Sequence, residues 1–132
     1  MKRLNYFISN WLPVFLWMGF IFTLSAQSKI SVTQTFVYDF MIFKTLHMIE
    51  YAFLYLLLFR AFYSIKNKNF PLSLKFILPI LISFIYSISD EFHQLYVPTR
   101  SGQWRDTGID LLGIILMYTL VKRYFRVLKK YL

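Results

Sequence analysis

The stretch FILPILISFIYSI, residues 76–88, decides the fold class of this chain. It contains no charged residue, and similar apolar runs occupy residues 11–24, 53–59 and 111–121. An α-helix rises about 1.5 Å per residue, so about 20 mostly apolar residues are needed to cross the hydrocarbon core of a bilayer. Extended by their mainly apolar flanks, the four runs approach this length, which favours membrane-spanning helices.

The overall composition leads to the same class of protein. Of the 132 residues, 58% are hydrophobic and 21% aromatic, while only 16% are charged. A water-soluble fold of this size cannot bury so much apolar surface. The polar connections between the apolar runs are short, so we expect residues 1–132 to form a single transmembrane domain.

The helix pattern predicts an all-α membrane protein with four transmembrane helices in an up-and-down bundle. The expected helices cover about residues 7–26, 43–65, 72–92 and 107–124. Residues 27–42 are polar enough to leave the bilayer yet carry several apolar side chains. An amphipathic segment lying along the interface and an ordinary loop both fit this stretch.

The basic residues predict the orientation, because they resist translocation across the membrane. On one side of the predicted bundle lie Lys2, Arg3, Arg60, Lys66, Lys68, Lys75, Lys122, Arg123, Arg126, Lys129 and Lys130. The other side has only Lys29, Lys44, Arg100 and Arg105. We therefore expect both chain ends in the cytoplasm. A cleaved signal peptide is the alternative for the first helix, but the apolar stretch is longer than the usual signal region of about 7–15 residues.

The net charge of +9 does not predict a nucleic-acid partner, because the basic residues gather at the ends of apolar segments. Anionic lipid head groups are the expected counter-charge. The chain has no cysteine, which excludes disulfides and thiolate metal sites.

All acidic residues and both histidines map to the half of the predicted bundle that faces outward. This set comprises Asp39, Glu50, Asp90, Glu91, Asp106, Asp110, His47 and His93. A charged side chain inside a bilayer costs about 2.5 to 3.5 kcal/mol on insertion scales, so such groups normally face the bundle interior and have partners. Helical spacing brings them to common faces, since His47 lies three residues before Glu50, and Asp90 lies four before Gln94. The pattern predicts an outward-facing polar pocket, with Gly113 small enough to admit a neighbouring helix.

Several chemistries fit these residues. The candidate catalytic residues are His47, Glu50, Asp90, Glu91, His93 and Asp106. The candidate substrate-binding residues are Lys44, Gln94, Arg100, Arg105 and Asp110. Histidines beside carboxylates act as general acids and bases, and the same set could hold a divalent metal, whereas Arg could clamp a phosphate. The plain alternative is a set of structural ion pairs, Arg105 with Asp106, and Lys44 with Glu50 or Asp39.

The order of these motifs resembles the VanZ-like family of small bacterial membrane proteins. The resemblance is carried by SDEFHQ at residues 89–94, VPTR at 97–100, SAQS at 25–28, and by Lys44, His47, Glu50, Tyr51, Arg105, Asp106, Asp110 and Gly113. Thr99 stands where the family often has Gly, and Asp110 where Asn is common. The resemblance implies a multi-pass protein of the cell membrane, and the family's namesake is associated with low-level resistance to the glycopeptide teicoplanin.

Three functions fit the sequence and the resemblance. The leading hypothesis is an envelope enzyme acting on a lipid-linked or phosphate-bearing substrate, such as a cell-wall precursor, at the outer leaflet, with His47 and His93 as acid and base. The second is capture or shielding of an envelope lipid or amphiphilic drug without chemistry. The third, a small transporter, is disfavoured because the inner half of the predicted bundle has no acidic or histidine residue for a proton relay.

Overall fold

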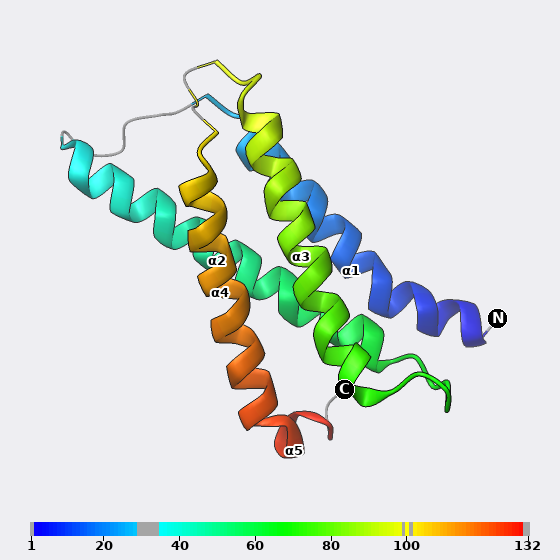
Figure 1. The fold of residues 1–132 in the computed structure, drawn as a ribbon. Coiled ribbons are helices and arrows are strands. Elements are labelled where there is room, and N and C mark those ends of the chain that lie inside the picture. Colours follow the sequence, from blue (N-terminus) through cyan, green and yellow to red (C-terminus); the bar gives the residue numbers. More distant parts are fainter. Residues whose placement is uncertain (1, 29–34, 99, 101, 131–132) are drawn as a thin grey trace.

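The computed structural model describes residues 2–28, 35–98, 100 and 102–130. Every regular element in these residues is a helix, which confirms the all-helical prediction: α1 (Lys2–Ser25), α2 (Phe36–Tyr63), α3 (Leu72–Gln94), α4 (Trp104–Arg123) and the short α5 (Phe125–Leu128). Successive long helices run in roughly opposite directions, so the end of α1 lies near the connection between α3 and α4 (Figure 1).

Among the described residues, three helices are long and apolar enough to cross a membrane. They are the stretches Asn5–Ser25, Val37–Tyr63 and Leu72–Gln94. Helix α4 has 20 residues, but its ends and first turns carry Arg105, Asp106, Asp110, Lys122 and Arg123. It is not among the three, so the fourth transmembrane helix stays a prediction.

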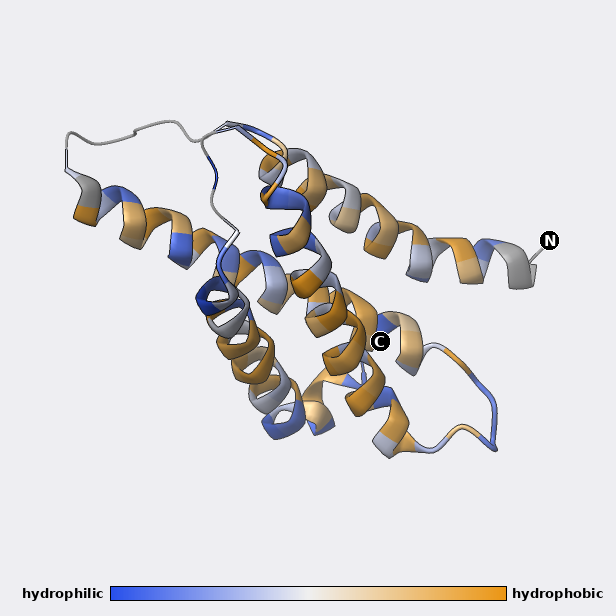
Figure 2. Ribbon diagram, turned by 45° about the horizontal axis from the view of Figure 1, so that its top comes forward, coloured by the Kyte–Doolittle hydropathy of each residue, from blue (hydrophilic) through white to orange (hydrophobic). Residues whose placement is uncertain are grey.

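The surface of α3 shows the arrangement expected of a membrane protein. Its exposed residues include Ile77, Leu81 and Ile85, whereas its buried residues include Ser87 and Asp90. A helix of a soluble protein presents polar groups outward and apolar groups inward, which is the reverse. Apolar residues colour much of the long helices in Figure 2. The fold and the composition together identify a membrane protein.

Part of the core is aromatic. The rings of Phe59 and Phe76 lie 4.8 Å apart, and Tyr55 meets Tyr118 edge-on at 6.2 Å. Phe125 packs against Phe76 with ring centroids 5.5 Å apart. Edge-to-face and offset ring pairs of this kind are favourable beyond the area that they bury. These aromatic contacts join α2, α3, α4 and α5.

Helices α2 and α4 make a close backbone approach at Gly113. A Cβ atom at this position would overlap the backbone carbonyl oxygen of Met48 on α2. Only glycine allows this separation, because any side chain would push the two helices apart. The prediction that Gly113 admits a neighbouring helix is confirmed.

The start of α2 differs from the prediction. The helix begins at Phe36, so residues 36–42 continue into α2 and form neither a separate interfacial segment nor a loop. Phe40 lies in this part, and its ring receives the Lys44 ammonium at 5.6 Å and the Arg105 guanidinium at 5.4 Å. These cation–π contacts favour the additional turns. The rest of the predicted interfacial segment, residues 29–34, and Thr99 lie outside the described residues.

Helices α1 and α4 also begin earlier than expected, at Lys2 and Trp104. At the start of α4, the Gln103 backbone N–H donates a hydrogen bond of 2.9 Å to Glu91 Oε2 on α3. A carboxylate at a helix N-terminus satisfies a free N–H group and is favoured by the helix dipole. Hydropathy depends on residue order and does not include this contact between two helices, so the predicted start of α4 was too late.

Candidate functional site

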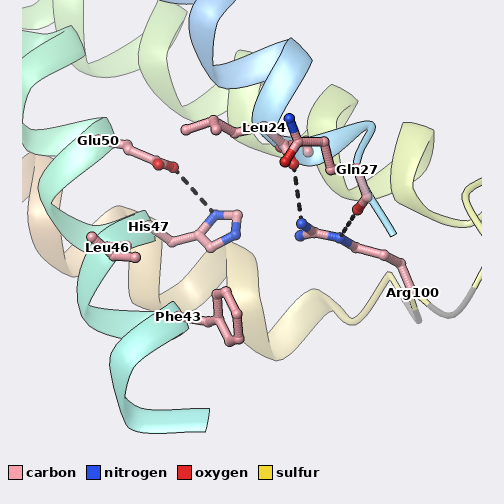
Figure 3. Close-up of a pocket in the computed structure, with 8 residues that line it drawn as sticks. Leu24, Gln27, Phe43, Leu46, His47, Glu50 and Arg100 are labelled. Atoms are coloured by element: carbon pink, nitrogen blue, oxygen red, sulfur yellow. Dashed lines mark hydrogen bonds and ion pairs between the residues drawn. The ribbon is translucent and has the colours of Figure 1, made fainter. Parts of the chain in front are cut away.

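A cavity of about 110 Å³ lies between the end of α1, α2 and the α3–α4 connection. Its lining residues are Leu24, Ser25, Gln27, Phe43, Leu46, His47, Glu50 and Arg100. In Figure 3, His47 and Glu50 extend from α2 toward the space that Arg100 enters from the other side. The structure therefore brings together part of the predicted polar set from three different segments.

His47 lies between two carboxylates. Its Nδ1 atom is 3.9 Å from Glu50 Oε2 and 3.8 Å from Asp110 Oδ1. Both distances exceed the hydrogen-bond range of about 2.7 to 3.2 Å, and Nδ1 is buried without a hydrogen-bond partner among the described residues. The ring is thus placed to exchange a proton or to accept a hydrogen bond from a group that enters beside it.

Asp90 and Asp110 are buried next to the cavity. Asp90 Oδ2 accepts hydrogen bonds from Ser25 Oγ at 2.8 Å and from Gln94 Nε2 at 3.0 Å. Asp110 Oδ2 accepts one from Ser87 Oγ at 2.6 Å. The second oxygen of each carboxylate, Oδ1, has no such partner in the described part of the chain. Each carboxylate is therefore oriented through one oxygen, while its other oxygen is buried without a hydrogen-bond partner in these residues.

Tyr51 lies one turn after His47 on α2, next to the same polar region. It is 0% exposed and belongs to the hydrophobic core. Its hydroxyl has no hydrogen-bond partner within the described segments. A buried hydroxyl without a partner is unfavourable, so this group calls for a ligand or an ordered water.

A second group, which we call the rim cluster, consists of Lys44, Asp106, Glu91 and Arg105. Lys44 forms an ion pair with Asp106. Arg105 donates a hydrogen bond of 3.0 Å to Gln103 Oε1 rather than pairing with Asp106 as the structural alternative proposed. The rim cluster orders the start of α4, and none of its members lines the cavity.

Arg100 is engaged with the end of α1. Its Nε donates to the carbonyl oxygen of Gln27 at 2.9 Å, and its Nη2 donates to that of Leu24 at 3.0 Å. These carbonyls lie at a helix C-terminus, where a cation is favoured and the last oxygens need donors. Arg100 therefore holds the α3–α4 connection against α1 at the cavity wall.

His93 lies against α1 and outside the cavity lining. Its ring stacks on Phe22 of α1, with centroids 4.4 Å apart and planes inclined by 28°. It is not a lining residue of the cavity. The structure thus does not bring the two histidines together as the acid and base of one site.

Two serines contribute more than the sequence interpretation allowed. Ser25 was noted only through the family resemblance, and Ser87 was not singled out. Ser83, Ser87, Asp90 and Gln94 follow one another at spacings of four, three and four residues, and all are buried on α3. This polar stripe at helical period was the signal that would have identified Ser87.

The arrangement suits proton transfer and hydrogen bonding. His47 and Glu50 line the cavity, and Asp90 and Asp110 lie directly behind Ser25 and His47. Among the described residues, no three His, Asp or Glu side chains form a group that could hold a metal ion.

Comparisons with known proteins agree with the motifs. Searches of curated proteins and of solved structures found no match. A family model described as VanZ/LLP1 matches residues 7–128, which is nearly the whole chain. The chain belongs to the VanZ/LLP1 family.

Proposed function

We propose that this protein acts on the head group of an amphiphilic cell-envelope molecule, lipid-linked or phosphate-bearing, that enters the cavity between α1, α2 and the α3–α4 connection. The observation that carries the proposal is the position of His47 between Glu50 and Asp110 on the wall of that cavity. Leu24, Phe43 and Leu46 supply an apolar part of the wall. A site that is both apolar and acid–base competent fits an amphiphile better than a soluble polar metabolite.

The proposed topology has four membrane spans, both chain ends in the cytoplasm and the cavity facing outward in the cell membrane. The asymmetric distribution of lysine and arginine supports this orientation. For α4, the acidic residues Asp106 and Asp110 are buried inside the bundle, and Lys122 and Arg123 lie in its last turn. Charges placed in this way are compatible with a membrane span.

In the proposed mechanism, His47 is the proton acceptor or donor for the reacting head group. Glu50 and Asp110 lie beside the imidazole and would balance the positive charge that the ring acquires when it accepts a proton. We assign this role to His47 rather than His93, because only His47 lines the cavity. Arg100 would hold an anionic group through the part of its guanidinium not bonded to α1.

The test is turnover by the purified full chain in lipid. The protein is incubated with a panel of envelope lipids and lipid-linked precursors, with and without a chelator, and the products are identified by mass spectrometry. We expect conversion of at least one lipid by the wild type and its loss in His47→Gln. Binding without conversion of any lipid would contradict catalysis and support the alternative, capture of an envelope lipid or drug.

A link to teicoplanin is a further part of the proposal. It is supported by the family membership and by the amphiphilic character of the cavity lining. Expression of the wild type is expected to lower teicoplanin susceptibility relative to an empty vector, and His47→Gln at equal membrane level is expected to remove the effect. An unchanged susceptibility would remove glycopeptides from the list of ligands.

A further inference from the structure

We infer that the cavity selects an amphiphile that carries a primary ammonium group, with this group bound at Asp90 and Asp110. The inference rests on the proposed function, because it uses the same cavity. It adds the chemical class of the head group, which neither the sequence nor the family membership supplies.

The first argument is charge balance. Glu50 lines the cavity, and Asp90 and Asp110 are buried behind its wall. Lys44 is paired with Asp106 in the rim cluster, which leaves Arg100 as one cation in the cavity lining against these three carboxylates. Buried carboxylates are costly without a cationic or hydrogen-bonding partner. The inner end of the cavity therefore favours a cation over an anion.

The second argument is the set of unused polar atoms. Asp90 Oδ1, Asp110 Oδ1, His47 Nδ1 and the Tyr51 hydroxyl are all buried and have no hydrogen-bond partner within the described residues. Tyr51 is 0% exposed and lies one turn after His47 on α2. The Tyr51 hydroxyl is therefore a second observation, separate from the carboxylates, that indicates a missing polar partner in this region.

The number and type of these atoms distinguish among cations. A primary ammonium has three N–H donors, which match the available acceptors. A quaternary ammonium has no N–H donor and is recognised instead by aromatic faces. Two of the four unused atoms are carboxylate oxygens and the other two, His47 Nδ1 and the Tyr51 hydroxyl oxygen, can also accept, so the site favours –NH₃⁺ over –N(CH₃)₃⁺.

The route to the acids and the size of the cavity favour a head group over a bare ion. Ser25 lines the cavity and its Oγ donates to Asp90 Oδ2 at 2.8 Å, so the Ser25 side chain is the group that separates Asp90 from the cavity. The volume of about 110 Å³ exceeds that of a single small ion. Leu46 lines the cavity and is 47% exposed on the surface of α2, which would suit an adjoining acyl chain.

The experiment compares three lipids with identical acyl chains and different head groups. The purified full chain in detergent is titrated with dioleoyl phosphatidylethanolamine, phosphatidylcholine and phosphatidylglycerol, and binding is measured by native mass spectrometry. We expect the ethanolamine lipid to bind about tenfold more tightly than the other two, since charge-assisted hydrogen bonds of the ammonium are absent from both.

Isosteric variants locate the effect. Asp90→Asn and Asp110→Asn are expected to bring ethanolamine-lipid binding down to the level of the choline lipid. Tyr51→Phe removes only an unpartnered hydroxyl and is expected to weaken the preference by a few-fold while the protein stays folded. Asp39→Asn is the matched control, because it removes a carboxylate in the first turn of α2 that does not line the cavity; its preference should equal that of the wild type.

Each other outcome overturns the inference. Equal binding of ethanolamine and choline lipids would show that the site does not recognise the N–H donors of the ammonium. Tighter binding of the glycerol lipid would show that the site prefers an anion. Thermal stabilisation by NaCl but not by choline chloride, with no ethanolamine preference, would assign the carboxylates to an inorganic cation. The lipid comparison in the wild type decides the matter even if an Asn variant does not fold. Turnover of a lipid without an amine would overturn this inference and leave the proposed function intact. Amine-selective binding without any turnover would support this inference and contradict the catalytic part of the proposed function.

Discussion

His47 Nδ1 on α2 and Asp110 Oδ1 on α4 lie 3.8 Å apart, and both atoms are buried without a hydrogen-bond partner among the described residues. The gap is about 1 Å longer than a hydrogen bond. Because α2 and α4 are in backbone contact at Gly113, the distance is set by the packing of the two helices. The pair is therefore held ready for a ligand rather than closed on itself.

This pair predicts unequal roles for the two histidines. His47→Gln is expected to reduce lipid turnover by about 10²- to 10⁴-fold, the usual contribution of a general acid or base. His93→Gln is expected to cost much less, because its ring stacks on Phe22 and does not line the cavity. Rates are compared at equal amounts of folded protein. Equal losses in the two variants would contradict the assignment of the acid–base role.

The close approach of α2 and α4 predicts a difference between two glycines of the same helix. Gly113→Ala is expected to destabilise the protein by about 1 to 3 kcal/mol, because its Cβ would overlap the Met48 carbonyl oxygen. Gly108→Ala is the control, since nothing lies within 4 Å of its Cβ, and it is expected to leave stability unchanged or slightly increased. Thermal unfolding in detergent measures both. A similar melting temperature for the two variants would mean that the helices are not in contact at Gly113.

The contacts of Arg100 predict a local change in dynamics. Arg100→Met removes the donors to Leu24 and Gln27, so amide hydrogen exchange should increase in the last turn of α1 and in the α3–α4 connection. Arg105→Met is the control for the end of α1, because its exposed side chain donates to Gln103 rather than to α1. Hydrogen exchange with mass spectrometry reads both segments. Unchanged exchange at the end of α1 in Arg100→Met would show that the contact does not hold α1 in solution.

The proposed topology is testable because the chain contains no cysteine, so one introduced thiol reports a single position. Pro98→Cys in the α3–α4 connection is expected to react with a membrane-impermeant maleimide in intact cells. Lys68→Cys in the α2–α3 connection should react only after permeabilisation, since this connection is expected in the cytoplasm. The reverse pattern would place the cavity on the cytoplasmic side and contradict action at the outer leaflet.

The class of protein and one helix could be read from residue order because hydropathy is a local property. The apolar run at residues 76–88 predicted α3, whose bounds of Leu72–Gln94 differ from the expected ones only at the end. The motifs likewise predicted the VanZ/LLP1 family. The acids and histidines were identified as a set, because ionisable groups in apolar helices stand out from their neighbours.

The pairing within that set was decided by tertiary structure. One residue along a helix turns a side chain by about 100°, so small differences in helix rotation and register choose its partner. Lys44 pairs with Asp106 rather than with an acid of its own helix, and His93 faces Phe22 instead of joining His47. The early start of α4 depends on Glu91 of α3, whose carboxylate accepts a hydrogen bond from the backbone N–H of Gln103. Such contacts depend on how the helices pack together, which local periodicity does not encode.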